Sequence, residues 1–162
     1  MKKRMFSFCI ALVLTGAFLL SGCGKKVQAS DLMKGVKAND VSKEAVLRDE
    51  DTVAAADFAV RLFQASREEN SEVVISPVSV LYALAMTANG ADGETLAQME
   101  NMLGLSVDKL NPYLYAYKEA LASGNKYKLD LANSIWFKDD ESLNVNPDFL
   151  QANADWYDAE LY

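Results

Sequence analysis

The stretch Glu72–Met86, EVVISPVSVLYALAM, decides the fold, because it changes from a strand pattern to a helix pattern at a single proline. The β-branched run Val73–Ile75 is too short for a helix and predicts a brief buried strand. Ser76 is a favoured N-cap residue and Pro77 is tolerated at the first helical position, so a helix should begin there. An apolar face at helical spacing predicts a central position for this helix: Leu81, Leu84, Ala85 and Ala88.

Helical patterns also lie on both sides of this stretch. Asp51 or Thr52 can cap a helix before it, and Gly104 can stop a short helix after it, for which Thr95 is the candidate cap. Pro147 behind Asn146 starts the last helix, which should continue into the final residues. The expected ranges are 51–67, 96–103, 108–124 and 147–162.

Residues 127–137, YKLDLANSIWF, alternate between apolar and polar positions and predict one long strand. Leu131, Ile135 and Phe137 share one side of this strand with Asn133. Together with the helices, the strand predicts an α+β fold for residues 51–162.

The N-terminus predicts an exported protein. Three cations precede an apolar run, and small residues then lead to Cys23, so residues 1–22 read as a signal peptide. Leu20–Cys23, LSGC, resembles a bacterial lipobox, which implies cleavage before Cys23 and attachment of a lipid to its sulfur. Residues 23–50 lack sustained apolar periodicity and predict a tether. The expected location is the outer face of a bacterial cell membrane, or the extracellular space.

Composition excludes several chemistries. The chain has no histidine, so a nucleophile with a histidine base and a zinc site with histidine ligands are both excluded. Its 16 Lys and Arg against 23 Asp and Glu argue against a nucleic-acid partner. A calcium loop with Gly93 at its sixth position would need an acid at Met99, so that pattern fails. The sequence predicts neither an enzyme nor a metal site, and it predicts no cofactor.

Three stretches together resemble the serpin family of serine protease inhibitors. They are VVISPVSVLYALAMTANGADGETLAQM from Val73, LANSIWF from Leu131 and FLQANADWYDAELY from Phe149. The resemblance covers roughly residues 53–162 and rests on the order of the motifs, which is more specific than any one motif. It implies that residues 51–162 form the N-terminal, incomplete portion of a serpin-like fold. Such a fold combines helices with strands of a large antiparallel-type sheet.

The resemblance also assigns roles to individual residues. It places a group of structural residues in the shutter beneath the centre of the large sheet, and another group in a turn between helices. Glu72 departs from the pattern, because serpins commonly have asparagine there. The shutter residues are Ser76, Pro77, Ser79 and Asn133, and the turn or cap residues are Gly90 and Thr95.

The function that the resemblance implies is inhibition of serine or cysteine proteases by a suicide-substrate mechanism. A target protease cleaves an exposed reactive loop, the loop inserts into the large sheet as a new strand, and the bound protease is distorted. Serpins carry that loop near their C-terminus, so we expect it to be missing from this N-terminal part. The alternative is a non-inhibitory cell-surface lipoprotein that acts as a binding or structural module.

Overall fold

The computed structural model describes residues 29–67, 72–122, 131–138, 140 and 142–162. The chain divides into two units after residue 30, and the fold below is that of the unit Asp31–Tyr162. Cys23 and the predicted signal peptide lie outside the described residues. Within the described ranges, no helix is both long and apolar enough to cross a lipid bilayer.

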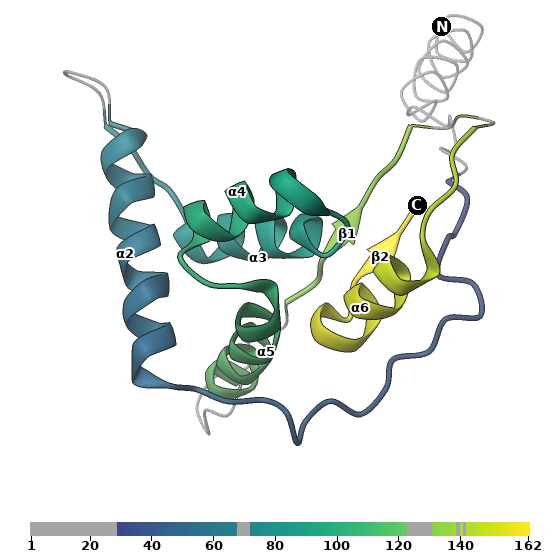
Figure 1. Cartoon of the computed structure of the whole chain (residues 1–162), viewed down its shortest axis with the longest axis horizontal. Coiled ribbons are helices and arrows are strands. Elements are labelled where there is room, and N and C mark those ends of the chain that lie inside the picture. The colour runs from purple at the N-terminus through teal and green to yellow at the C-terminus, as the bar shows by residue number, and fades with distance from the viewer. Residues whose placement is uncertain (1–28, 68–71, 123–130, 139, 141) are drawn as a thin grey trace, which may run out of the picture. The chain divides into compact units, whose positions relative to one another are not determined.

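Helix α3 (Pro77–Ala88) is the centre of the helical part, as its apolar face predicts. Helices α2 (Asp49–Ala65), α4 (Gly93–Leu103) and α5 (Val107–Ala122) pack against it (Figure 1). The hydrophobic core collects around these contacts. Its most deeply buried apolar side chains include Leu81, Ala85, Leu103, Leu110 and Leu114.

The ends of α4 show one correct and one wrong prediction. Gly104 ends the helix with a φ of 82°, a left-handed conformation that glycine adopts without strain, so the predicted stop is confirmed. Thr95 is not the cap, because α4 begins two residues before it. Asp92 caps the helix instead, and its Oδ1 accepts the Gly93 amide at 2.7 Å.

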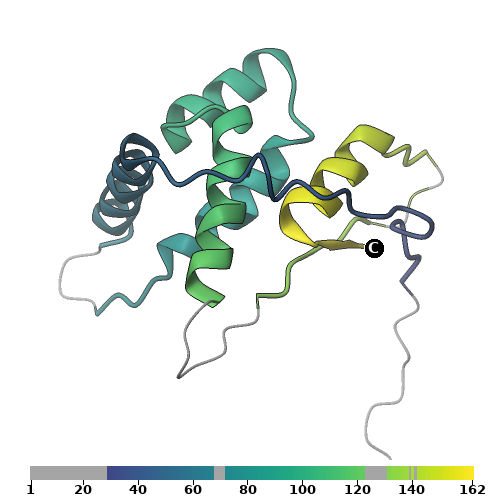
Figure 2. The ribbon, with the colours of Figure 1, turned by 90° about the horizontal axis from the view of Figure 1, so that it is seen from below.

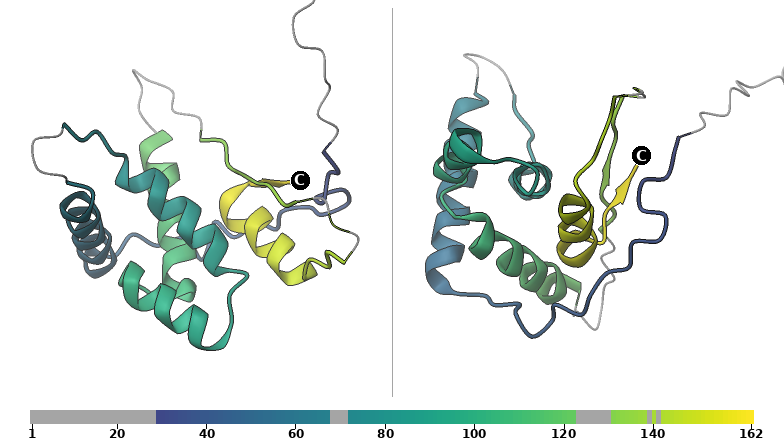
Figure 3. Two further views of the ribbon diagram at one scale, coloured as in Figure 1. Left: turned by 90° about the horizontal axis from the view of Figure 1, so that it is seen from above. Right: turned by 45° about the vertical axis from the view of Figure 1, so that its right-hand side comes forward.

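Strands β1 (Ser134–Ile135) and β2 (Glu160–Leu161) form a two-stranded parallel sheet with α6 (Pro147–Tyr157) between them in sequence (Figure 3). The family resemblance implied strands of an antiparallel-type sheet, whereas these two strands pair in parallel, and residues 160–161 were expected to belong to the last helix. Parallel neighbours require a crossover segment, and α6 supplies it. The last helix ends at Tyr157, because Asp158 adopts a left-handed conformation and turns the chain into β2.

The predicted strand at 127–137 is shorter where it is described. Residues 127–130 lie outside the described part, and of residues 131–137 only Ser134 and Ile135 form a strand. Val73–Ile75 also differ from the prediction: they are not assigned to a strand, and Val74 is fully exposed. A strand exists only through a bonded neighbour, and no described residue pairs with this run.

The predicted tether is packed against the unit over part of its length. The Leu32 amide donates to the Leu161 carbonyl at 2.9 Å, and the Gln151 side chain donates to the Lys37 carbonyl at 2.9 Å. Val41 is buried. Figure 2 shows this segment running past α6. Residues 31–41 are therefore held on the unit, in contrast to the free tether expected from their composition.

Asp155 on α6 holds this segment and gives its stability a pH dependence. Partial burial raises the pKa of the Asp155 carboxyl, but the Asn39 amide, the Asn39 side chain and the Gln151 side chain donate to it and bring the pKa below its usual value. A lowered pKa means that the contact is fully stable above the ordinary aspartate pKa. It is lost as the pH falls through the lower, folded-state pKa.

We predict that Asp155→Ala speeds hydrogen exchange of the Asn39 amide about fivefold at neutral pH, the equivalent of one lost hydrogen bond of about 1 kcal/mol. In the unsubstituted protein, acidification to well below the ordinary aspartate pKa of about 3.9 should lower the protection factor of the Asn39 amide, which is the exchange rate corrected for the intrinsic effect of pH, by a similar factor. Asp158→Asn is the matched control, because Asn also tolerates the left-handed conformation there. Equal exchange rates in the Asp155→Ala and Asp158→Asn variants would contradict the prediction.

Candidate functional site

The predicted shutter residues Ser76, Pro77 and Ser79 lie together at the first turn of α3. Ser76 is the N-cap: its Oγ accepts the Ser79 amide at 3.4 Å, and the two hydroxyl oxygens lie 2.8 Å apart. Pro77 occupies the first helical position, where its missing N–H has no intrahelical partner to lose. The predicted cap is confirmed.

These two serines have capping geometry and lack the geometry of a nucleophile. Both side chains are exposed, and the partner of each hydroxyl is the other hydroxyl or a backbone amide. A catalytic serine needs an adjacent base to take its proton. What this turn can do is fix the direction in which α3 leaves the preceding extended segment.

Asn133, the fourth predicted shutter residue, lies at the start of the strand pair. Its carbonyl accepts the Glu160 amide at 3.0 Å, and its side-chain amide reaches the Tyr157 carbonyl at a long 3.5 Å. The residue therefore joins the beginning of β1 to the segment that connects α6 with β2. Ile135 and Phe137 on the same side of the chain pack against the core, whereas Trp136 on the other side is exposed.

Gly90, the predicted turn residue, lies just beyond the far end of α3. A Cβ atom at this position would meet two ring carbons of Phe149 at 2.9 Å, closer than such atoms approach in proteins. A side chain in place of Gly90 would therefore collide with the Phe149 ring, so glycine lets α6 pack against this turn without a shift. Ser76 and Gly90 flank the 12-residue helix α3, so the turn residue and the shutter serines do not share one site.

A buried polar cluster between three helices was missed in the sequence analysis. The side chains of Asn89 and Asn111 exchange hydrogen bonds at 2.8 and 3.3 Å, and the Tyr157 hydroxyl donates to Asn111 Oδ1. Asn89 caps the end of α3, Asn111 belongs to α5 and Tyr157 to α6. The only sequence signal was the presence of asparagine inside an otherwise apolar helical pattern.

Two tyrosines of this region stay neutral. Burial raises the pKa of Tyr157 and of Tyr82 well above the usual tyrosine value, and the two rings meet edge to face with centroids 6.0 Å apart. The Tyr82 hydroxyl donates to the Leu114 carbonyl at 2.6 Å. Both hydroxyls therefore keep their protons and donate hydrogen bonds that hold the packed helices together. A raised pKa makes a tyrosine a poor general base near neutral pH.

The buried acid Asp51 lies apart from the shutter and turn residues. Asp51 is 1% exposed and its nearest cation is the Arg48 guanidinium at 3.5 Å, so this carboxylate is held at the first turn of α2. Within the described ranges, no group of three acidic, histidine or cysteine side chains is placed to hold a metal ion. The described site is structural: a helix start, a strand junction and a close turn.

Comparison of the chain with known proteins shows the family to which it belongs. The family model for serpins, described as serpin (serine protease inhibitor), matches residues 53–162. The chain belongs to the serpin family. Leukocyte elastase inhibitor of Bos taurus is 35% identical over 107 residues, which cover 64% of this chain and 28% of that protein. Serpin B8 of Homo sapiens is 34% identical over 108 residues, with the same two coverages.

Solved structures agree with this assignment. The thermophilic serpin tengpin in its native state is 48% identical with a TM-score of 0.72, covering 83% of this chain and 35% of tengpin. Tengpin in its latent state is 47% identical with a TM-score of 0.66, covering 73% of this chain and 33% of that one. The present chain thus spans about a third or less of the length of these relatives. The α+β prediction and the serpin-like fold are confirmed.

We predict that Ser76→Ala removes the N-cap and raises the exchange rate of the Ser79 amide about fivefold, because losing such a cap costs about 1 kcal/mol. Ser76→Asp should restore slow exchange, since its carboxylate accepts the same amide. Hydrogen exchange followed by NMR reads this amide directly. If Ser76→Ala and Ser76→Asp both leave the rate unchanged, Pro77 alone directs the helix start and the hydroxyl has no capping role.

Proposed function

We propose that this chain is the N-terminal part of a serpin-type protease inhibitor that acts as a suicide substrate of serine or cysteine proteases. The serpin match across residues 53–162 carries this proposal, and the similarity to tengpin at 48% identity supports it. The mechanism needs a reactive loop and a sheet that receives it. It needs no catalytic residue from the inhibitor, in keeping with a structural role for the described site.

The solved structures of tengpin in a native and in a latent state bear on the mechanism, because they describe a serpin in two states. We propose that the protein to which this chain belongs can also change between two states. A serpin inhibits by changing state, and a change of state requires strands that can part while the helical core stays intact.

The geometry of β1 fits that requirement. The strand pairs with β2 through a short parallel register, Ser134 with Glu160 and Ile135 with Leu161. One side of it packs on the helical core, and the exposed indole of Trp136 lies on the other. Within the part of the chain that the structure describes, only this short pairing has to break for the strand to shift. The hydrogen-bonded turn of Ser76 and Ser79 fixes the start of α3. Helix α3 can therefore keep its position while the strand shifts.

The alternative function is a non-inhibitory lipoprotein that acts as a binding or structural module at the cell surface. The hinge that precedes the reactive loop discriminates the two, since inhibitory serpins need small side chains there to enter the sheet. A hinge rich in alanine, glycine and threonine favours the inhibitor. Bulky or charged residues at the hinge favour the alternative.

For location, we propose that residues 1–22 are removed on export and that Cys23 carries a lipid. The support is the order of charge, apolar run and LSGC motif in the sequence. An inhibitor anchored in this way would act on proteases at the outer face of a bacterial membrane.

We predict that the natural gene product, expressed from Met1 to its own stop codon, forms a one-to-one complex with a serine or cysteine protease that survives boiling in detergent. Gel electrophoresis against a panel of such proteases checks this. The control is a chain ended at Tyr162, which should form no complex, because it lacks the reactive loop. Rapid cleavage of the full product by every protease, without a stable complex, would favour the non-inhibitory alternative.

We predict that Cys23→Ser moves the protein from the membrane fraction to the medium. Cys9→Ser is the matched control, because Cys9 lies in the part removed with the signal, and this variant should stay with the membrane. Mass spectrometry of the membrane-extracted protein should show a diacylglyceryl group on Cys23. Unchanged partitioning of the Cys23→Ser variant would refute the lipid anchor.

A further inference from the structure

Asn89 is the only asparagine in the sequence that is followed by a glycine, Gly90. In such a pair, the backbone nitrogen of the second residue can attack the side-chain carbonyl carbon of the asparagine and close a ring. A side chain on the second residue obstructs this approach, whereas glycine leaves its backbone free to turn. Spontaneous deamidation is therefore chemically easiest at this pair.

The structure places the pair where water can reach it. Asn89 is the C-cap of α3 and is half-buried, and Gly90 beside it is exposed. Both residues line an open cleft between this turn and the segment that leads into α6, which includes Val145 and Asn146. Hydrolysis of the ring needs water, and this cleft admits it.

The folded structure keeps the two reacting groups occupied. The Asn89 side-chain nitrogen donates to the Ala85 carbonyl at 3.0 Å and to Asn111 Oδ1 at 3.3 Å, and Asn89 Oδ1 accepts the Asn111 side chain at 2.8 Å. The Gly90 amide donates to the Thr87 carbonyl at 3.0 Å. Ring closure requires the Asn89 side chain to leave Asn111 and the Gly90 nitrogen to leave Thr87. Deamidation is therefore blocked while these bonds persist.

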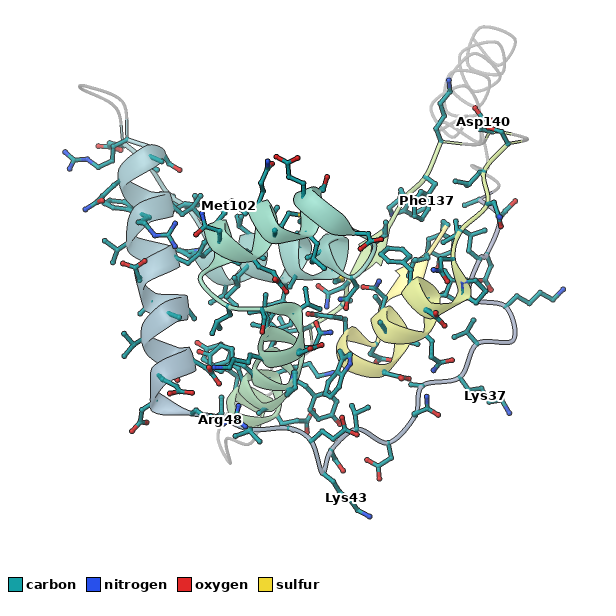
Figure 4. All side chains as sticks on the ribbon, viewed as in Figure 1. Lys37, Lys43, Arg48, Met102, Phe137 and Asp140 are labelled. Carbon is teal, nitrogen blue, oxygen red and sulfur yellow. The ribbon has the colours of Figure 1, made fainter. Side chains whose placement is uncertain are left out.

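Helix α6 controls whether they persist. The Tyr157 hydroxyl donates to Asn111 Oδ1 and holds the partner of Asn89 in place. The Phe149 ring lies against Gly90, where a Cβ atom would meet two of its carbons at 2.9 Å, so the peptide has little room to turn. Phe137, which Figure 4 shows beside α6, meets the Phe149 ring edge to face with centroids 6.4 Å apart. Movement of α6 releases both constraints.

We propose that Asn89–Gly90 is a modification site at which deamidation takes place only when α6 moves away from the end of α3. The Gly90 nitrogen bonds to Cγ of Asn89, and its proton passes through water to the side-chain nitrogen, which leaves as ammonia. Water then opens the ring at one of its two carbonyls. Opening at one carbonyl gives aspartate at position 89, and opening at the other gives isoaspartate.

The modification makes this movement irreversible. A carboxylate has no hydrogen to donate, so the bonds to the Ala85 carbonyl and to Asn111 Oδ1 are lost. A charge at this half-buried position is also costly without a partner. Isoaspartate further lengthens the backbone of the turn. Helix α6 then has a weaker attachment to α3, and β2, which follows α6 directly, loses part of its support.

The rate of deamidation tests the control by α6. The full-length gene product is kept in mildly alkaline buffer, and peptide mass spectrometry follows aspartate and isoaspartate at position 89. We expect Tyr157→Phe to raise the rate about fivefold, the effect of one lost hydrogen bond on local opening. Tyr82→Phe is the matched control, because it removes a buried hydroxyl that donates to the Leu114 carbonyl outside the cluster, and it should leave the rate unchanged.

The unsubstituted protein supplies a second measurement that needs no variant to fold. In denaturant, the rate at Asn89 should be about tenfold or more above that of the folded protein. Equal rates in these two conditions, or equal acceleration by Tyr157→Phe and Tyr82→Phe, would overturn control by α6. Aspartate without isoaspartate would overturn the ring step, since direct hydrolysis of the side chain gives aspartate alone.

Hydrogen exchange tests the consequence. Asn89→Asp should speed exchange of the Glu160 and Tyr162 amides of the strand pair about tenfold, because two hydrogen bonds of the cluster are lost. Asn144→Asp adds the same charge at an exposed position of the segment before α6 and should leave these amides unchanged. Equal exchange in the two variants would show that deamidation does not loosen the strand pair.

Discussion

The side chains of Asn89, Asn111 and Tyr157 meet in a buried cluster on which the arrangement of α3, α5 and α6 depends. Each helix contributes one polar group that would be costly to bury alone, and the three groups satisfy one another. Apolar packing alone tolerates sliding of one helix on another. Hydrogen bonds of this kind permit only a narrow range of positions, so the cluster fixes where α6 lies.

The position of α6 in turn fixes the remaining elements. The Phe149 ring on α6 lies so close to Gly90 that a side chain there would force the ring or the backbone to shift. After α6, the left-handed Asp158 directs the chain into β2, which pairs with β1 in parallel. The same helix carries Asp155 and Gln151, which hold the segment at residues 37–39. The strand pair and the N-terminal segment thus share one support.

This arrangement suits a serpin, in which some strands change partners while a helical base stays intact. The parts with many buried contacts are α3 and its neighbours, whereas β1 and β2 pair over two residues each. Local stability in proteins follows such differences in burial and pairing. The strands that we propose to take part in the change of state lie at the periphery of this core.

Prediction from sequence succeeded where the signal is local and failed where it is distant. The starts of α3 and α6 follow from Ser76–Pro77 and Asn146–Pro147, and both caps are confirmed. Thr95 was the predicted cap of α4 and Asp92 is the cap in the structure, because both residue types can cap a helix and only the backbone path separates them. Residues 73–75 were expected to form a strand but do not. Their β-branched side chains make them suitable for a sheet, but they do not show whether another strand lies beside them to pair with.

The sequence by itself determined where helices begin, which faces they bury and to which family the chain belongs, because caps, periodicity and motif order act over a few neighbouring residues. The tertiary structure alone decided the parallel pairing of β1 with β2, the amide cluster between three helices and the docking of residues 31–41. Each of these joins groups that are distant in the chain, such as Asn39 and Asp155. Their partners are selected by the geometry of the folded core, and no local pattern encodes that choice.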